Sequence, residues 1–323
     1  MRVLVTGATG YVGSRLVPRL LERGHDVHAA VRREGSADDF PWVDDVVLTR
    51  FDITDPDLVR EAVQGVDAVV YLIHSLGSED FLTRDREAAE RVAAACEQAG
   101  VGRLVYLSGL VPDEPDGGDL SDHLRSRLQV EEVFLGSAVP ATVLRAAMVV
   151  GAGSTSFEIL RRLTRRMPIA PIPTWMRSRL QPVTIEEVVL AVAGALDGEP
   201  RDRHYDVGGD DVVTYPELLR VMAEVLGVRR PHVTVPGVPK ALAGRIVAAL
   251  TRMDRPTVVS LVDSLSHDLV CGEEDAKRDL LPADYRSVPL REALRRSLDD
   301  GSGSGEGTTA AGDSLSGART DPA

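Results

Sequence analysis

The spacing of apolar residues changes regularly along the first half of the chain. Short apolar runs such as Val3 to Val5 and Val27 to Val31 are typical of buried strands, and between them apolar residues recur three or four positions apart, as in amphipathic helices. The pattern predicts strands at 3–5, 27–31, 46–50, 68–73, 103–107 and 141–145, and helices at 11–23, 56–63, 79–99 and 121–135. Strands and helices that alternate in this way predict an α/β fold with a doubly wound parallel sheet and right-handed crossovers.

The pattern is different after Gly151. It predicts helices at 157–167, 184–196 and 215–226, a short strand at 205–207, a proline-broken loop at 168–173 and mainly helical structure from about 230 to 297. From Gly301 onward, Gly, Ser, Thr and Ala dominate without apolar periodicity, which predicts a disordered tail or a linker. We therefore expect a core at 1–150 that is completed by 181–207, a small, mainly helical C-terminal lobe at 151–298, and a disordered tail at 299–323.

The first strand runs directly into a glycine-rich turn and then into a helix. Gly7 permits a tight turn, Gly10 lets the backbone approach a pyrophosphate, and Gly13 lets the helix pack close to the strand. The positive end of the helix dipole would then face the phosphates. This context predicts a Rossmann-type dinucleotide site rather than a turn without a ligand, held by Gly7, Thr9, Gly10, Tyr11, Val12 and Gly13.

Two arginines stand where a coenzyme-selecting residue is expected. An NAD site usually has Asp or Glu about 20 residues beyond the turn, where it binds the ribose 2′-hydroxyl. This chain has Arg32 and Arg33 there, and a guanidinium can pair with a 2′-phosphate. NADP(H) is therefore favoured over NAD(H), although two solvated arginines at a strand end would give the same sequence.

Further coenzyme contacts are expected after the third and fourth strands. Asp52 and Ile53 would flank the adenine; alternatively Asp52 caps the helix that begins near Pro56, and both can hold because Thr54 and Asp55 are better cap candidates. Leu72 and His74 end the fourth strand, and strand ends of open α/β sheets face the ligand crevice. His74 would reach the nicotinamide or a substrate oxygen; the alternative is a structural histidine bonded to backbone.

Composition limits the partners and the compartment. The chain has 323 residues, 43% of them hydrophobic, which suffices for one large or two modest domains. Its net charge of −13 argues against a nucleic-acid partner. We expect no signal peptide, no transmembrane helix and no metal site, and Cys96 and Cys271 are the only cysteines, as in a reducing cytoplasm.

The motifs together resemble the short-chain dehydrogenase/reductase superfamily. The resemblance rests on the glycine turn, on Gly65 to Val69 at the entry to the fourth strand and on Val105 to Ser108. It covers about residues 1 to 298 and is strongest to atypical, extended-type members: NAD(P)H-binding epimerase-like proteins, the NmrA-like group and the accessory 39 kDa-type subunit of respiratory complex I. Membership implies a Rossmann-type oxidoreductase or a coenzyme-binding relative of one.

The catalytic positions depart from that family's pattern. Active members use Ser, Tyr and Lys, with Tyr-x-x-x-Lys on one helical face. Here Ser108 matches the serine, but His123 and Arg127 stand where Tyr and Lys are expected. The resemblance implies that Ser108 holds the substrate oxygen and that Arg127 positions the nicotinamide ribose.

Two interpretations of His123 stay open. Because imidazole titrates near neutral pH, His123 would replace Tyr as proton donor, and the chain would transfer hydride between NADPH and a small carbonyl, enone or quinone-like substrate. Alternatively, the proton relay is lost and the chain is a non-catalytic sensor or accessory subunit. A third possibility, sugar-nucleotide epimerisation, fits poorly because the tyrosine is missing.

Candidate ligand contacts in the lobe each have a structural alternative. The four arginines at 161, 162, 165 and 166 would meet an acidic ligand or form a solvated helix face, and the second is favoured. Trp175 and Met176 would cover a hydrophobic substrate or pack in the core. The helix at 241–253 has an apolar face that would touch a membrane surface or, as is commoner, the core.

Overall fold

Seven parallel strands form the central sheet of the computed structural model, which describes residues 1–33, 35–74, 80–112 and 120–302. All six neighbouring pairs are parallel. The strand order reverses between β1 and β4, and this reversal confirms the predicted doubly wound α/β sheet. In spatial order the strands are β11 (Arg203–Val207), β6 (Ala141–Ala146), β5 (Arg103–Gly109), β4 (Ala68–Tyr71), β1 (Arg2–Thr6), β2 (Asp26–Val31) and β3 (Val47–Arg50).

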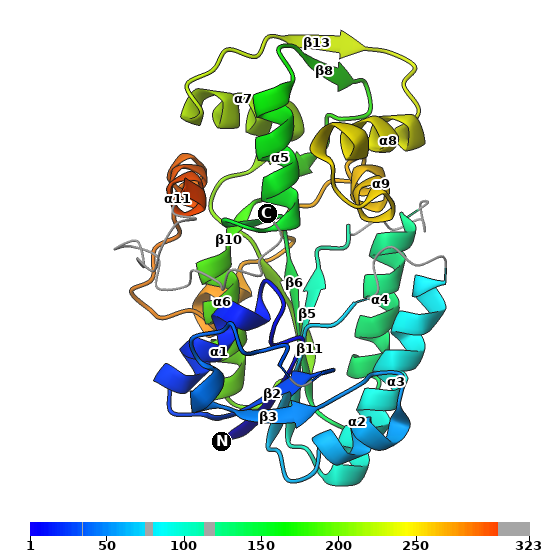
Figure 1. The fold of residues 1–323 in the computed structure, drawn as a ribbon, viewed down its shortest axis with the longest axis vertical. Helices are drawn as coiled ribbons and strands as arrows, with labels where there is room; N and C mark the ends of the chain where they lie inside the picture. Colours follow the sequence, from blue (N-terminus) through cyan, green and yellow to red (C-terminus); the bar gives the residue numbers. More distant parts are fainter. Residues whose placement is uncertain (34, 75–79, 113–119, 303–323) are drawn as a thin grey trace.

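Helices cover both faces of the sheet (Figure 1). On one face, α1 (Gly13–Glu22) and α6 (Ile185–Asp197) bury side chains such as Leu16 and Val188 against the strands. On the other face, α2 (Pro56–Ala62), α3 (Phe81–Ala99) and α4 (Asp122–Leu135) bury Val92 and Phe134. The sheet is thus packed between two apolar layers.

Local capping explains where the helices begin. Asp55 caps α2 by accepting from the backbone N–H groups of Asp57 and Leu58. Asp52 instead accepts from the backbone N–H of Thr54 at 2.9 Å and from its hydroxyl at 2.7 Å. The alternative that Asp52 caps this helix is therefore wrong, because its carboxylate binds Thr54, which lies before the helix begins.

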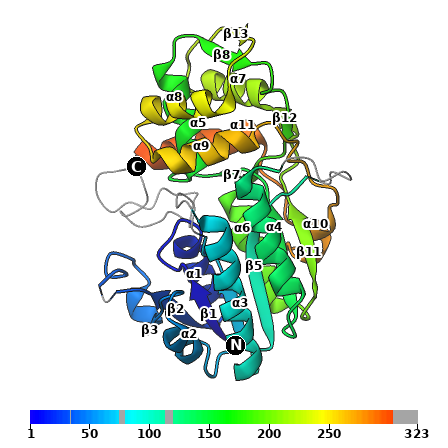
Figure 2. The same cartoon turned by 90° about the vertical axis from the view of Figure 1, so that its right-hand side faces the viewer.

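The C-terminal lobe stacks on the strand ends and is mainly helical (Figure 2). Two apolar clusters meet on its long helix α5 (Thr155–Arg166): one joins it to α7 (Tyr215–Val225) and α11 (Leu290–Ser302), and the other to α8 (Lys240–Thr251) and α9 (Arg255–Ser264). The remaining short elements are the 3₁₀ turn Val43–Asp45, β7 (Val149–Val150), β9 (Arg179–Leu180), β10 (Val183–Thr184), β12 (Val213–Thr214) and α10 (Asp275–Asp279).

One predicted loop is a strand. Residues predicted as a proline-broken loop contain β8 (Ala170–Pro173), which pairs in parallel with β13 (His232–Val235) inside a region predicted as mainly helical. The predicted loop is therefore wrong at β8, whereas the region from about 230 to 297 is mainly helical as predicted, with β13 as its one described strand. Each strand of a two-stranded ribbon has an unpaired edge, so the missing N–H groups of Pro171 and Pro173 are tolerated there.

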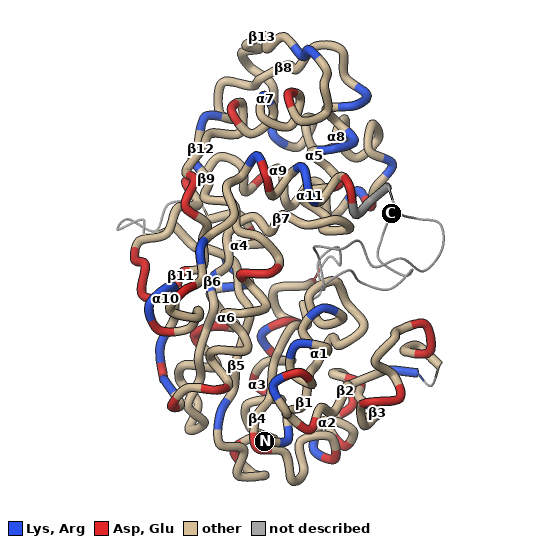
Figure 3. The backbone as a smooth tube through the Cα atoms, turned by 90° about the vertical axis from the view of Figure 1, so that its left-hand side faces the viewer, with Lys and Arg blue, Asp and Glu red and all other residues tan. Residues whose placement is uncertain are grey.

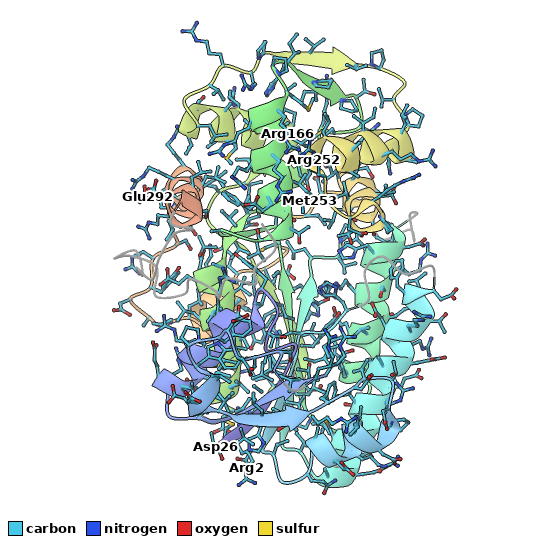
Figure 4. The ribbon with its side chains drawn as sticks, viewed as in Figure 1. Arg2, Asp26, Arg166, Arg252, Met253 and Glu292 are labelled. Carbon is cyan, nitrogen blue, oxygen red and sulfur yellow. The ribbon has the colours of Figure 1, made fainter. Side chains whose placement is uncertain are left out.

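Arginines of α5 bind the end of α8. Arg162 donates to the carbonyl of Thr251 at 2.9 Å, and Arg166 donates to the carbonyl of Leu250. Figure 4 shows Arg166 beside Arg252, the residue that ends α8. Cations are favourable at a helix C-terminus. These two arginines therefore hold the lobe together and do not form an open anion site.

The distribution of charged residues and the hydropathy of the helices bear on which partners the protein could bind. On the face drawn in Figure 3, Lys and Arg alternate with Asp and Glu over the coloured part of the tube, without a continuous basic stripe. Within the part of the chain that the structure describes, every helix is too short or too polar to cross a bilayer. The tail predicted to begin at residue 299 begins too early, because α11 continues through residue 302; from residue 303 onward the tail lies outside the described residues.

Candidate functional site

The turn after β1 has a geometry that only glycine permits. Gly7 has a φ of +74°, and the N–H of Gly10 donates to the Gly7 carbonyl at 3.0 Å. A Cβ on Gly13 would lie 2.2 Å from the same carbonyl oxygen. The turn therefore packs the start of α1 tightly on β1. The N–H groups of Ser14 and Arg15 already donate to the carbonyls of Gly10 at 2.9 Å and Val12 at 3.2 Å, so an anion at this helix start would meet the amides that precede them.

A cavity of about 820 Å³ begins at this turn. It passes the carboxyl ends of β4 and β5 and continues into the lobe, and small-molecule sites commonly enclose roughly 300 to 1,000 Å³. The predicted site residues that line it are Gly7, Gly10, Tyr11, Val12, Gly13, Leu72, His74, Ser108, His123 and Arg127. The structure thus gathers residues from the turn, two strand ends and α4 around one space.

Ser108 is the clearest sign of a ligand. Its side chain is only 4% exposed, and its hydroxyl has no hydrogen-bond partner among residues 1–33, 35–74, 80–112 and 120–302. A buried hydroxyl without a partner costs about 1–3 kcal/mol, so proteins seldom retain one without a functional reason. Ser108 lies at the end of β5 in the cavity wall, where a ligand oxygen would satisfy it.

The helix α4 places His123 and Arg127 one turn apart on the cavity wall. Ser121 caps this helix by accepting from the N–H of Leu124, and Arg127 donates to the carbonyl of Leu107 at 3.3 Å. Burial, and then the charge of Arg127, lower the pKa of His123 to about 3. The imidazole is therefore neutral near pH 7, which corrects the expectation that it titrates there.

His74 belongs to the same electrostatic group. The charge of Arg127, burial and the neighbouring His123 together hold the pKa of His74 well below its usual value. His74 is exposed and lines the cavity just after β4. Two neutral imidazoles and one guanidinium thus face the space beside Ser108.

Five predicted coenzyme contacts lie outside the cavity wall: Thr9, Arg32, Arg33, Asp52 and Ile53. Arg32 and Arg33 follow β2 with exposed side chains, and no described residue hydrogen-bonds to either guanidinium. Thr54 hydrogen bonds lower the pKa of Asp52, and the charge of Arg32 adds to this effect. The carbonyl of Ile53 accepts from Arg91 at 2.6 Å. The strands β2 and β3 lie next to β1 in the sheet. All five residues therefore follow the carboxyl ends of neighbouring strands.

Sequence reasoning missed the lobe part of the cavity wall. That part is mostly apolar and comes from α5, α7, α8 and α9; it includes Leu160, Leu163, Met167, Leu218, Leu219, Val247, Leu250 and Leu261. Trp175 and Met176, predicted from the sequence as candidate ligand contacts, also line it. The apolar spacing of these helices was visible, but spacing does not distinguish a side chain that packs in a core from one that faces a cavity.

The glycine turn and the strands after it match a known family. Residues 7–167 fit the model of a family described as NAD(P)H-binding. This part of the chain is an NAD(P)H-binding domain. The chain is 26% identical over 309 residues to NADH dehydrogenase [ubiquinone] 1 alpha subcomplex subunit 9 of Arabidopsis thaliana, which covers 88% of this chain and 75% of that protein.

Other similarities agree with this NAD(P)H-binding domain. Ceramide reductase of Caulobacter vibrioides is 26% identical over 307 residues, covering 90% of this chain and 88% of that protein. Thermus thermophilus UDP-glucose 4-epimerase, solved with NAD, has a TM-score of 0.68 at 21% identity and covers 94% of this chain and 100% of that one. The resemblance to epimerase-like and complex I 39 kDa-type members of the short-chain dehydrogenase/reductase superfamily is confirmed.

Proposed function

We propose that the chain is an NADP(H)-dependent reductase that acts on a carbonyl, enone or quinone-like group. The observation that carries the proposal is the Ser108 hydroxyl, which is buried, without a partner in the described structure, and in the same cavity wall as His123 and the glycine turn. The ceramide reductase similarity adds support. We propose further that residues 1–150 with 181–207 hold the coenzyme, that residues 151–298 hold the substrate, and that the protein works in the cytoplasm.

The side chains around Ser108 suit the negative charge that develops on a reduced oxygen. When bound, a nicotinamide coenzyme supplies the hydride. The Ser108 hydroxyl would donate a hydrogen bond to the substrate oxygen, and the neutral imidazole of His123 would donate a second. The guanidinium of Arg127 would add positive potential as well as position the ribose. Because His123 is neutral, the proton that balances the hydride would come from water and not from an imidazolium.

The proposal names NADP(H) because of Arg32 and Arg33. Both guanidiniums are exposed at the end of β2, on the edge of the sheet that the glycine turn shares. A 2′-phosphate would give each a charged partner, and charge-assisted hydrogen bonds are the stronger kind. Thr9, Asp52 and Ile53 would lie along the adenosine half of the coenzyme.

A second candidate function is coenzyme binding without turnover, as a sensor or accessory subunit. The low pKa of His123 favours this alternative, because the group that replaces the catalytic tyrosine cannot supply a proton from a charged form. The similarity to a subunit of NADH dehydrogenase agrees with it. Sugar-nucleotide epimerisation ranks third, since likeness to an epimerase at 21% identity concerns the fold alone.

The test is NADPH oxidation across a panel of ketones, enones and quinones, with Ser108→Ala as the comparison. We expect turnover with at least one class, and a loss of about 100-fold in kcat/KM for Ser108→Ala, the size of effect typical when one oxyanion donor is removed. NADPH binding with no oxidation by any member of the panel would contradict the reductase and favour the accessory role.

A further inference from the structure

The cavity does not end at Ser108 but continues into the lobe, and we call this continuation the lobe chamber. It lies between the two apolar clusters that meet on α5, so that α7 forms one wall and α8 and α9 form the other. Six half-buried apolar side chains line it: Leu163, Met167, Leu219, Val247, Leu250 and Leu261. Apolar surface left facing a cavity is stabilised when an apolar ligand covers it.

Five polar side chains of the chamber wall are already engaged within the protein. Their hydroxyl and guanidinium hydrogens point to backbone carbonyls or to neighbouring side chains, so these five offer few free donors to a sugar or a nucleotide, and Thr155, Ser156 and Tyr215 are the further hydroxyl groups of the wall. The engaged groups are Ser154 to the Val149 carbonyl at 2.9 Å, Thr164 to the Leu160 carbonyl at 2.8 Å, Thr257 to Asp254 at 2.7 Å, Ser264 with Ser121 at 2.8 Å and Arg230 to the Thr164 carbonyl at 2.7 Å.

The chamber reaches the surface at an apolar rim on α8. Ile246 lines the cavity and is also 48% exposed, and Leu242, one turn earlier on α8, is 49% exposed. In Figure 2, α8 lies at the outer side of the lobe. An apolar ligand chain inside the chamber would therefore reach solvent along apolar side chains.

We propose that the substrate of the reductase is a lipid: its reducible oxygen lies at Ser108 and His123, and a long apolar chain fills the lobe chamber. The reduction of this lipid rests on the proposed function. The binding of its apolar chain rests on the lobe chamber alone. It replaces the expectation of a small substrate, because a small carbonyl would leave the apolar wall of α5, α8 and α9 uncovered. Ser108 fixes one end of the ligand, and the chamber selects its length.

A homologous series of alcohols tests the binding of a long apolar chain without requiring any reaction. The neutral dye Nile red is bound to the full-length protein and displaced by straight-chain primary alcohols from octanol to hexadecanol, with and without NADPH. Each methylene buried adds about 0.8 kcal/mol, so Kd should fall by about fourfold for each added carbon until the chamber is full. A Kd that does not change with chain length would overturn the proposal.

Variants that fill the chamber locate the binding. Leu261→Trp and Val247→Trp place bulk in its wall, whereas Val212→Trp adds the same bulk at a position that is 45% exposed and outside the cavity. We expect hexadecanol affinity to fall at least tenfold in the first two and to stay unchanged in Val212→Trp, with NADPH affinity kept in all three. Unchanged hexadecanol affinity in a folded Leu261→Trp or Val247→Trp would overturn the proposal. If neither variant folds, the alcohol series on the wild-type protein still tests it.

The two proposals fail in different ways. If NADPH is never oxidised but the alcohols bind with the expected length dependence, the reductase is wrong and the lipid site stands. If short and long methyl ketones are reduced with equal kcat/KM, the reductase stands and the lipid substrate is wrong. A ketone series whose kcat/KM rises with chain length in parallel with alcohol affinity supports both.

Discussion

Arg127 lies one helical turn beyond His123 on α4, and its charge adds to burial in lowering the pKa of the His123 imidazole to about 3. In the related enzymes a lysine at this spacing activates a tyrosine. Here the arginine has a comparable place, but the group that it acts on becomes a neutral hydrogen-bonding partner.

The low pKa of His123 predicts a loss of stability in mild acid. In the unfolded chain its pKa would return to about 6.5, so below that pH the unfolded state binds a proton that the folded state excludes until about pH 3. Stability is full above pH 6.5 and falls by up to about 1.4 kcal/mol per pH unit below it. Melting temperatures from pH 8 to pH 4 should therefore fall less steeply for His123→Gln than for the wild type. Parallel curves for the two proteins would contradict this prediction.

Arg127 should control both imidazoles of the site. Arg127→Ala should raise the pKa values of His123 and His74, but that of His123 should stay below 6.5 because burial is the larger cause. The imidazole C–H resonances, followed by NMR across a pH titration, measure this directly. Arg125→Ala removes an exposed arginine from the same helix and should move neither pKa. Equal shifts in the two variants would mean that the charge of Arg127 does not act locally.

Arg32 and Arg33 should decide between the two coenzymes. The double variant Arg32→Ala, Arg33→Ala removes the proposed partners of a 2′-phosphate, and hydrogen bonds to charged groups are worth about 1.5–3 kcal/mol each. NADPH affinity should fall at least tenfold, while NADH affinity should change little. Calorimetric titration with both coenzymes provides the internal control. An equal loss for NADPH and NADH would show that these arginines do not read the phosphate.

Removing the Ser108 hydroxyl should separate stability from activity. Because this buried hydroxyl has no partner in the described structure, Ser108→Ala should leave the free energy of unfolding unchanged or higher. The matched control is Ser121→Ala, a buried serine that caps α4 and contacts Ser264, and it should lose about 1 kcal/mol. Denaturant unfolding measures both. A clear loss of stability in Ser108→Ala would mean that the hydroxyl has a structural partner.

The core could be predicted because its signals are local. The turn at Gly7, the cap at Ser121 and the apolar runs of β1 and β4 depend on a few adjacent residues, and each has a conformation that the sequence specifies directly. The gathering of Ser108 and His123 follows from topology, since strand ends of a parallel sheet meet at one edge.

The lobe could not be predicted in the same way. The pairing of β8 with β13 joins residues about 60 positions apart, and Pro171 and Pro173 argue locally against a strand. The pKa of His123 depends on how deeply the lobe buries it, which no local pattern records. The contact between Ser121 and Ser264 likewise joins α4 to α9 across the fold and has no sequence signature.

The most direct test of the account is coenzyme titration of the full-length protein, followed by its melting temperature, for wild type, Gly13→Ala and Gly198→Ala. A Cβ on Gly13 would meet the Gly7 carbonyl at 2.2 Å, whereas one on Gly198 would make an ordinary contact of 3.4 Å. At a hundredfold excess over Kd, NADPH should stabilise the wild type and Gly198→Ala by about 2.7 kcal/mol and Gly13→Ala much less. A melting temperature of the wild type that neither NADPH nor NADH changes would contradict the central claim that the glycine turn holds a nicotinamide coenzyme.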